Sequence, residues 1–162
     1  MQWLLIFKLV VLLTVANGTP VIATKLLGRF LNQPLDRGAS FVDGRPILGG
    51  SKTLRGIVLS LVATTAFAPI VGFEWIYGLI IASAAMIGDL SSSFLKRRLR
   101  LPPGSRATGI DQIPECLFPI VAISPALGLT AIDVLSVVII FFVGAVLLSR
   151  LLFNWNIRNR PY

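Results

Sequence analysis

The sequence predicts an all-α integral membrane protein with five transmembrane helices and a polar cavity on its cytoplasmic side. Hydrophobic residues make up 55% of the 162-residue chain, and charged residues only 14%. A soluble domain of this length could not bury so many apolar side chains, whereas a bilayer requires about 20 predominantly apolar residues for each helical span. The apolar residues also gather into separate stretches, divided by two long polar segments and by short turns. We therefore predict a single polytopic membrane domain covering residues 1–162.

The first span is predicted at residues 3–31, as a helix broken near Asn17-Gly18-Thr19-Pro20. A cleaved signal peptide is the alternative, because a short apolar run follows the start of the chain. Against it, no basic segment precedes Trp3, and the apolar pattern resumes after Pro20. Helix breaks at membrane depth are tolerated only where the freed backbone is buried in protein or lines a wet cavity.

Three further spans are predicted at residues 53–71, 75–95 and 134–153, each a long apolar stretch. The apolar stretch at 113–129 is shorter and contains three prolines. This pattern fits either a kinked span or a re-entrant segment.

The basic residues predict the orientation of the chain. Lysines and arginines occupy three segments, 25–55, 96–106 and 150–160, with Lys8 as the one exception. The short turns around Glu74 and Asp133 contain none. Under the positive-inside rule, the polar loops 32–52 and 96–112 and the C-terminus are cytoplasmic. We therefore predict a multi-pass protein of the cell membrane with its N-terminus outside and its C-terminus inside, which requires the proline-containing stretch to cross as well.

Composition also limits the chemistry. The chain has no histidine and one cysteine, Cys116, which removes the commonest transition-metal ligand and excludes an internal disulfide or a Cys-rich zinc site. The carboxylates, hydroxyls, lysines and arginines that remain suit Mg²⁺ and phosphate groups. A net charge of +8 would indicate nucleic acid in a soluble protein, but here the charge follows membrane sidedness. No nucleic-acid partner is expected.

Asp89 is the first candidate functional residue, because an ionisable group inside an apolar helix indicates a functional site. On a helix with 3.6 residues per turn, its stripe also carries Ser93, Lys96 and Arg100, and Ser92 and Arg97 flank it. Gly88 removes a side chain beside it and allows close backbone approach. A carboxylate beside hydroxyls and cations is what a metal-bridged phosphate site requires. Alternatively, Asp89 only neutralises Lys96 or Arg97, and the basic run binds lipid headgroups.

Two neighbouring segments complete the predicted pocket. Asp111 arrives at the start of the fourth span, where it lies near the same cavity, caps the helix, or does both. Residues 49–55, GGSKTLR, precede the second span, and glycines before a helix N-terminus expose N–H groups to a phosphate. Together, the two cationic loops predict two walls of a polyanion pocket.

Seven short motifs along residues 16–112 support a family assignment. They are Ala16-Asn17-Gly18-Thr19-Pro20, Pro34-Leu35-Asp36, Asp43-Gly44-Arg45-Pro46-Ile47-Leu48-Gly49, Lys52-Thr53-Leu54-Arg55-Gly56, Gly88-Asp89, Ser93-Phe94-Leu95-Lys96-Arg97-Arg98 and Asp111-Gln112. In this order they resemble the CDP-archaeol synthase family, which is distantly similar to phosphatidate cytidylyltransferases. Two departures stand out: Gly-Gly-Ser-Lys-Thr at 49–53 replaces the usual Gly-Asp-Gly-Lys-Thr, and Ile113-Pro114-Glu115 replaces an apolar-Asp-Phe run.

The resemblance implies a five-helix membrane fold with a polar cytoplasmic cavity. It also implies transfer of a cytidylyl group from CTP to a phosphorylated diradylglycerol of the archaetidic or phosphatidic acid type, with Mg²⁺ and release of pyrophosphate. The expected partners are CTP, this phosphorylated glycerolipid and membrane lipids. Because the lipid phosphate is already an anionic nucleophile, the reaction depends on in-line positioning and charge neutralisation.

We assign Asp89, Lys96 and Asp111 to catalysis, with both aspartates holding Mg²⁺. The expected substrate-binding residues are Asn17, Asp43, Lys52, Thr53, Arg55, Ser92, Ser93, Arg97, Arg98 and Gln112. A transporter for a phosphorylated solute is the first alternative, since broken helices and buried charge also mark transport sites. The missing internal repeat and the gathering of polar groups on one side argue against it. The second alternative is a non-catalytic membrane protein that binds anionic lipid.

Overall fold

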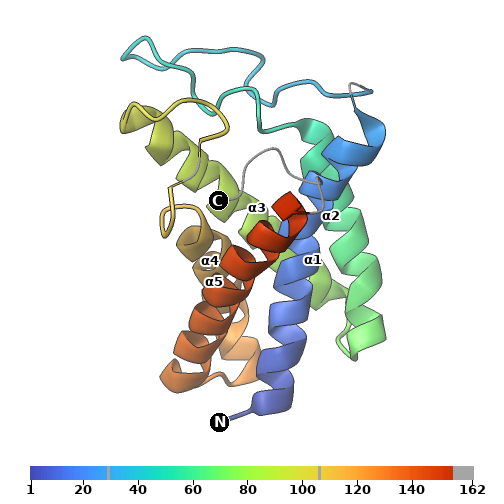
Figure 1. Cartoon of the computed structure of the whole chain (residues 1–162). Coiled ribbons are helices and arrows are strands. Elements are labelled where there is room, and N and C mark those ends of the chain that lie inside the picture. The colour runs from blue at the N-terminus through green and yellow to red at the C-terminus, as the bar shows by residue number, and fades with distance from the viewer. Residues whose placement is uncertain (29, 106, 155–162) are drawn as a thin grey trace.

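The computed structural model describes residues 1–28, 30–105 and 107–154, which form a bundle of α-helices (Figure 1). The helices are α1 (Trp3–Leu27), α2 (Leu54–Phe67), α3 (Trp75–Arg98), α4 (Gln112–Leu127) and α5 (Ala131–Asn154), and a 3-10 helix, η1 (Ala68–Val71), extends α2. Within the described residues there is no β-strand, only two isolated β-bridges. The predicted all-α fold is confirmed. The predicted basic tail after residue 154 lies outside the described residues.

Helix lengths agree with an integral membrane protein. The segments that are long and apolar enough to cross a membrane are Trp3–Leu27, Leu54–Val71, Trp75–Arg98 and Ala131–Leu151. The remaining helix, α4, has 16 residues and is continuous although Pro119 and Pro125 lie inside it. Its length corresponds to about 24 Å of helical rise, which is shorter than the roughly 30 Å of a bilayer's hydrocarbon core.

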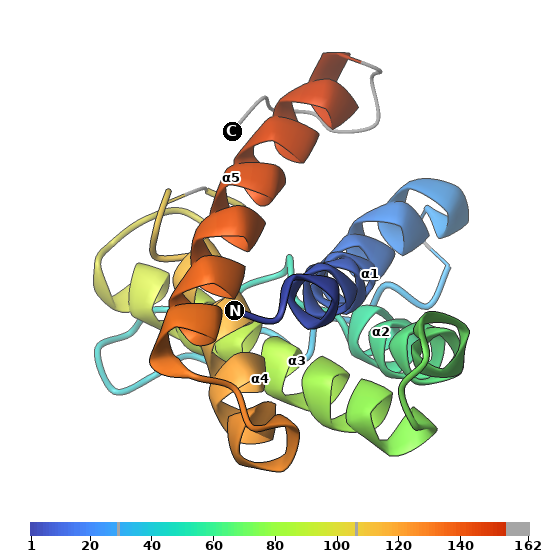
Figure 2. The ribbon, with the colours of Figure 1, turned by 90° about the horizontal axis from the view of Figure 1, so that it is seen from below.

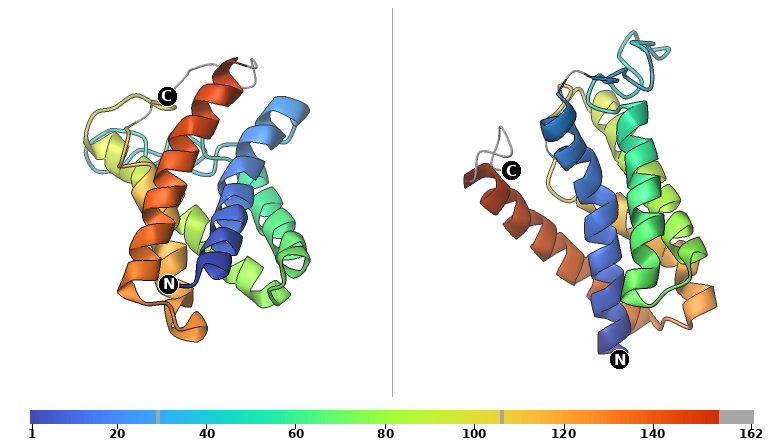
Figure 3. Two further views of the ribbon diagram at one scale, coloured as in Figure 1. Left: turned by 60° about the horizontal axis from the view of Figure 1, so that its bottom comes forward. Right: turned by 90° about the vertical axis from the view of Figure 1, so that its right-hand side faces the viewer.

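The two long loops lie together at one end of the bundle (Figure 1). They comprise residues 28–53 and 99–111, whereas the N-terminus and the short connections lie at the other end. α1 packs against α2, α3 and α5, and α4 packs against α3 and α5. Seen from below and from the side, α5 diverges from α1 toward the loop end, so that these two helices form a V (Figures 2 and 3).

The main apolar core joins α1, α3, α4 and α5. Its buried members include Ile6, Leu9, Leu12, Leu13, Ile81, Cys116, Ile120, Ile123, Val137 and Phe141. Large apolar side chains on the outer surface of α5 are exposed, among them Leu135, Ile139 and Val143. Exposed apolar side chains on a helix of spanning length are expected where the helix meets lipid.

The prediction of a broken first helix is wrong, because α1 continues through Pro20. A proline removes one N–H donor and leaves the carbonyl four residues earlier without its helical partner. Here that carbonyl belongs to Ala16, and the Ser60 hydroxyl of α2 donates to it at 2.7 Å. Gly56 brings α2 close to this point, since a Cβ on Gly56 would lie 3.3 Å from the Pro20 Cβ. The neighbouring helix thus supplies the hydrogen bond that the sequence of α1 lacks. At its C-terminal end, α1 stops at Leu27, earlier than the predicted boundary at residue 31.

Glycines set two close helix contacts of α3. A Cβ on Gly78 would lie 2.6 Å from the Thr64 carbonyl oxygen of α2, and a Cβ on Gly88 would lie 2.2 Å from the Pro114 carbonyl oxygen of α4. Small residues allow such close backbone approach between membrane helices. Gly88 thereby allows the first turn of α4 to lie against the segment that carries Asp89.

Candidate active site

A cavity of about 590 Å³ lies beneath the two loops and is bounded by α1, α3, α4 and α5. Its charged lining residues are Lys25, Lys52, Asp89, Lys96, Asp111 and Glu115. On its α5 side the lining is largely apolar, with Phe141, Gly144, Ala145 and Leu148, and α1 adds Pro20 and Val21 between polar residues. The cavity therefore joins a cluster of opposite charges to walls suited to a lipid. The predicted polar cavity exists.

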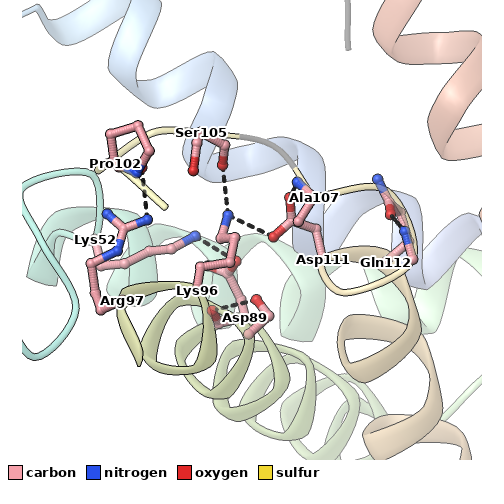
Figure 4. A network of polar contacts seen from close by, with 11 residues as sticks. Lys52, Asp89, Lys96, Arg97, Pro102, Ser105, Ala107, Asp111 and Gln112 are labelled. Atoms are coloured by element: carbon pink, nitrogen blue, oxygen red, sulfur yellow. Dashed lines mark hydrogen bonds and ion pairs between the residues drawn. The ribbon is translucent and has the colours of Figure 1, made fainter. Parts of the chain in front are cut away.

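Two ion pairs occupy this cavity (Figure 4). The Lys52 ammonium lies 2.5 Å from Asp89 Oδ1, and the Lys96 ammonium lies 2.6 Å from Asp111 Oδ1. All four side chains are largely but not fully buried, with exposed fractions between 8% and 20%. The alternative in which Asp89 neutralises Lys96 or Arg97 is wrong, because its ion-pair partner comes from the loop before α2.

The loop at 99–111 folds over the end of α3 through hydrogen bonds to the predicted site residues. Lys96 Nζ donates to the Ser105 carbonyl at 2.8 Å, and the Arg97 guanidinium donates to the Pro102 carbonyl at 2.7 Å. The Ala107 N–H donates to Asp111 Oδ2 at 3.0 Å. Asp111 precedes α4, but its side chain makes no capping hydrogen bond to the helix. Its carboxylate instead accepts from the Ala107 N–H of the loop and pairs with Lys96. Asp111 thus occupies the predicted N-cap position without capping the helix through its side chain, and it also lines the cavity.

The loop at 28–53 is organised by Asp36, whose carboxylate accepts hydrogen bonds from the N–H groups of Leu48 at 2.9 Å, Gly49 at 2.8 Å and Gly38 at 3.1 Å. Burial raises the pKa of Asp36, but the hydrogen bonds from Gly49, Leu48 and Gly38 more than offset this effect and hold that pKa below its ordinary value. The Leu35 N–H also donates to the Lys52 carbonyl at 2.7 Å. These contacts set the path of the backbone that delivers Lys52 to the cavity.

The structure divides the predicted site residues into two groups. Those that line the cavity are Asn17, Lys52, Thr53, Asp89, Lys96, Asp111 and Gln112. Those that do not line it are Asp43, Arg55, Ser92, Ser93, Arg97 and Arg98. Within the first group, Thr53 also caps α2 by accepting a hydrogen bond from the Gly56 N–H at 3.2 Å.

Arg98 and Asp43 form a clamp outside the cavity. Arg98 NH1 lies 2.8 Å from Asp43 Oδ1, and its guanidinium lies 4.7 Å from the Phe41 ring centroid and 4.9 Å from that of Phe94. Its other terminal nitrogen donates to the Pro46 carbonyl at 2.7 Å. These contacts attach the 28–53 loop to the end of α3, which places both residues in a structural contact and not on the cavity surface.

Arg55 is also engaged with the backbone. Its guanidinium donates to the carbonyls of Gly28 and Phe30 and to the Asn32 side chain, so it closes the turn that follows α1. Ser92 donates to the Asp89 carbonyl at 2.9 Å, and Ser93 is buried. Neither hydroxyl opens onto the cavity.

Glu115 lies in the cavity but was not assigned to the site from the sequence. It lines the cavity wall and lies on the turn of α4 that packs against the segment carrying Asp89. The close contact between Gly88 and the Pro114–Glu115 backbone accounts for this approach. An acid one turn into an apolar helix carries the same signal as Asp89, so the sequence contained the cue.

The acids suit Mg²⁺ in their chemistry. Among the described residues, no three His, Cys, Asp or Glu side chains form a cluster that could hold a metal. Mg²⁺, however, is usually held by one or two carboxylates together with substrate phosphates and water. Asp89 and Asp111 face one cavity, and both carry carboxylate oxygens, the ligand type that Mg²⁺ prefers. These two residues therefore fit the ion.

Comparisons with known proteins identify the family of the chain. A family model described as CarS-like CDP-archaeol synthase matches residues 63–162. A CDP-archaeol synthase of Sulfurisphaera tokodaii is 36% identical over 135 residues, covering 80% of this chain and 81% of the relative. One of Pyrobaculum calidifontis is 38% identical over 115 residues, covering 68% of each chain.

A solved structure, described as an intramembrane enzyme for archaeal membrane lipid biosynthesis, has the same fold. It matches with a TM-score of 0.75 and 28% sequence identity, covering 88% of this chain and 90% of that one. Sequence and fold therefore agree over most of the chain. The chain belongs to the CDP-archaeol synthase family of membrane nucleotidyltransferases.

Proposed function

We propose that this chain transfers the cytidylyl group of CTP to the phosphate of a diradylglycerol lipid, with archaetidic acid as the first candidate acceptor and phosphatidic acid as the second. A lipid-phosphate oxygen attacks the α-phosphorus of CTP, the bond from that phosphorus to the bridging oxygen breaks, and pyrophosphate leaves with the electron pair. The observation that carries the proposal is the pairing of two lysines with two aspartates in a cavity that also has apolar walls. The archaeal sources and the names of the relatives favour the ether lipid.

The reaction requires the protein to position the two substrates and to neutralise the charge of their phosphates. The nucleophile is an anion at neutral pH, so no serine or histidine has to be activated. Lys52 and Lys96 would hold phosphate oxygens. Asp89 and Asp111 would hold Mg²⁺, which supplies positive charge to the reacting phosphates when bound. Asn17, Thr53 and Gln112 line the cavity and offer hydrogen bonds to the nucleotide.

A membrane orientation follows from the same proposal. CTP is a cytoplasmic metabolite, and both basic loops lie at the cavity end, so this end faces the cytoplasm, with the N-terminus outside and the C-terminus inside. Cysteines placed singly at Ser40 and Ser105, in an otherwise cysteine-free variant, should resist a membrane-impermeant thiol reagent in intact cells. Labelling of either position in unbroken cells would contradict this orientation.

The test of the function is pyrophosphate release by purified protein in detergent with CTP and Mg²⁺. Phosphorylated diether and diester lipids, compared at equal concentration, identify the acceptor, and the matching lipids without phosphate serve as controls. A CDP-lipid product with stoichiometric pyrophosphate is expected from at least one phosphorylated lipid. A transporter would instead move a phosphorylated solute into vesicles and release no pyrophosphate, and a lipid-binding protein would bind without turnover.

A further inference from the structure

Lys52 and Asp89 bind each other in the cavity, and each thereby takes the place of the ligand that the other is proposed to hold. Under the proposed function, on which this inference rests, Asp89 holds the metal and Lys52 holds a phosphate of CTP. In the structure these two groups lie 2.5 Å apart and bind each other. The carboxylate is thus neutralised by an ammonium where a metal ion would be needed, and the ammonium is held where a phosphate would be needed.

The two ion pairs of the cavity differ in how firmly the lysine is held. Lys96 also donates to the Ser105 carbonyl, so it keeps a partner if Asp111 is taken by another cation. Among the described residues, the Lys52 ammonium has a single hydrogen-bond partner, Asp89 Oδ1. Lys52 also belongs to a different element from Asp89, since it lies in the loop before α2 and Asp89 lies in α3. The Lys52–Asp89 pair is therefore the one that a substrate can exchange.

Exchange of only one partner is unfavourable. If Mg²⁺ alone took Asp89, the Lys52 ammonium would lose its ion-pair partner and lie beside a bound cation in a largely buried site, and loss of a partner by a buried charge is costly. If CTP alone took Lys52, the bare Asp89 carboxylate would face a triphosphate of the same sign. When both arrive, Lys52 passes to a phosphate and Asp89 to the metal, and every charge keeps a partner.

We infer that Lys52 acts as a place-holding cation on Asp89, so that Mg²⁺ and CTP bind the free enzyme cooperatively, each strengthening the other. Lys52 is then a residue that couples two ligands, in addition to holding a phosphate. Coupling between two sites is reciprocal and commonly amounts to about 5- to 150-fold in affinity. The predicted sign at Lys52 is specific: removal of the lysine should strengthen metal binding when no nucleotide is present.

The experiment measures Mn²⁺ binding to the purified full-length protein without CTP or lipid, by the loss of the free-ion electron paramagnetic resonance signal. Lys52→Met should bind Mn²⁺ at least about fivefold more tightly than the wild type, the lower end of typical coupling. The matched control is Lys25→Met, which removes the same charge from the wall of the same cavity and leaves the Lys52–Asp89 pair in place. Its Mn²⁺ affinity should change clearly less.

A second variant identifies the ligand. Asp89→Asn combined with Lys52→Met should lose the gain seen with Lys52→Met alone, because the released carboxylate is no longer present. The inference is overturned if Lys52→Met leaves or weakens nucleotide-free Mn²⁺ binding, if Lys25→Met strengthens it equally, or if the double variant keeps the gain. Pyrophosphate release by the wild type is measured separately. Its absence would count against the proposed function, whereas turnover combined with any of these binding results would reject only the place-holding role.

Discussion

Replacing Gly88 by alanine should damage the active site more than the fold. The new methyl carbon would lie 2.2 Å from the Pro114 carbonyl oxygen, 2.5 Å from its carbon and 2.9 Å from the Glu115 nitrogen, whereas ordinary contact begins at 3.4 Å. All three atoms belong to the α4 backbone, so no flexible side chain can move aside. α3 and α4 must separate, and with them Asp89 and the acids of the α4 end.

The size of the effect follows from this geometry. Relief of the closest contact requires about 1 Å of separation, and a displacement of this size in a catalytic group costs on the order of 100-fold in rate. Overpacking of this kind destabilises by about 1–3 kcal/mol, partly offset by the roughly 1 kcal/mol by which alanine is the better helix former. We therefore expect a folded protein with kcat reduced about 100-fold.

The matched control lies on the same helix. A Cβ on Gly78 would lie 2.6 Å from the Thr64 carbonyl oxygen, at the contact of α3 with α2 and η1 and away from the cavity lining. Gly78→Ala should therefore lower the melting temperature in detergent about as much as Gly88→Ala, with a much smaller loss of kcat for CTP-dependent pyrophosphate release. Equal kcat losses in the two variants, or a Gly88→Ala enzyme with near wild-type kcat, would refute the assignment of Gly88 to the positioning of the acids.

Three further outcomes are expected. Ser60→Ala should lower the free energy of unfolding by about 1–3 kcal/mol, because it leaves the Ala16 carbonyl of α1 without a donor. The loss should be smaller in a Pro20→Ala background, where α1 supplies its own N–H. Equal losses in both backgrounds, measured by thermal unfolding, would contradict this. Because hydrogen bonds depress the pKa of Asp36 in the folded state, its contribution to stability is present at neutral pH and is lost as the pH falls through that lowered value, below the ordinary 3.8. Amide protection factors in the 28–53 loop, which compare the observed exchange rate with the intrinsic rate at the same pH, should therefore fall in acid. Asp36→Asn should show low protection at every pH, and a well-protected Asp36→Asn loop would disprove the role. Finally, Lys52→Ala should raise the KM for CTP about 10- to 150-fold, because one charge-assisted contact is lost, whereas Lys96→Ala should mainly lower kcat. Steady-state kinetics with both substrates varied measures these effects. If Lys52→Ala changed only the KM for the lipid, the roles of the two lysines would have to be exchanged.

The sequence predicted the elements of the fold better than the contacts between them. Long apolar stretches locate the helices because a membrane-spanning helix must be both long and apolar. The continuity of α1 could not be predicted in this way, since the donor that satisfies the Ala16 carbonyl is Ser60, 44 residues later in the chain. A helix read in isolation breaks at Pro20, and only its packing against α2 restores it.

The candidate site was only partly predictable, because some of its features follow from local sequence and others from contacts between distant segments. Helical spacing correctly places Asp89 and Lys96 on the cavity side of α3, because that relation is local. Local sequence does not distinguish Lys52 from Arg55, two cations in one motif. Only the folded chain shows that Lys52 reaches Asp89 while Arg55 binds the turn after α1. Glu115 was missed because its value depends on the contact of α4 with Gly88.

If the paired acids of the cavity carry the transfer reaction, removing the charge of one of them should stop turnover, whereas the same change to an acid outside the cavity should not. Asp89→Asn and Asp43→Asn make the same chemical change, the first inside the cavity and the second in the Arg98 clamp outside it. The measurement is the kcat of pyrophosphate release with CTP, Mg²⁺ and the phosphorylated lipid that supports the highest wild-type rate. We predict that Asp89→Asn lowers kcat by at least about 100-fold, as expected for loss of an essential electrostatic group, while Asp43→Asn stays near the wild-type value. Near-normal turnover by Asp89→Asn at saturating Mg²⁺, or an equal loss in Asp43→Asn, would contradict the account.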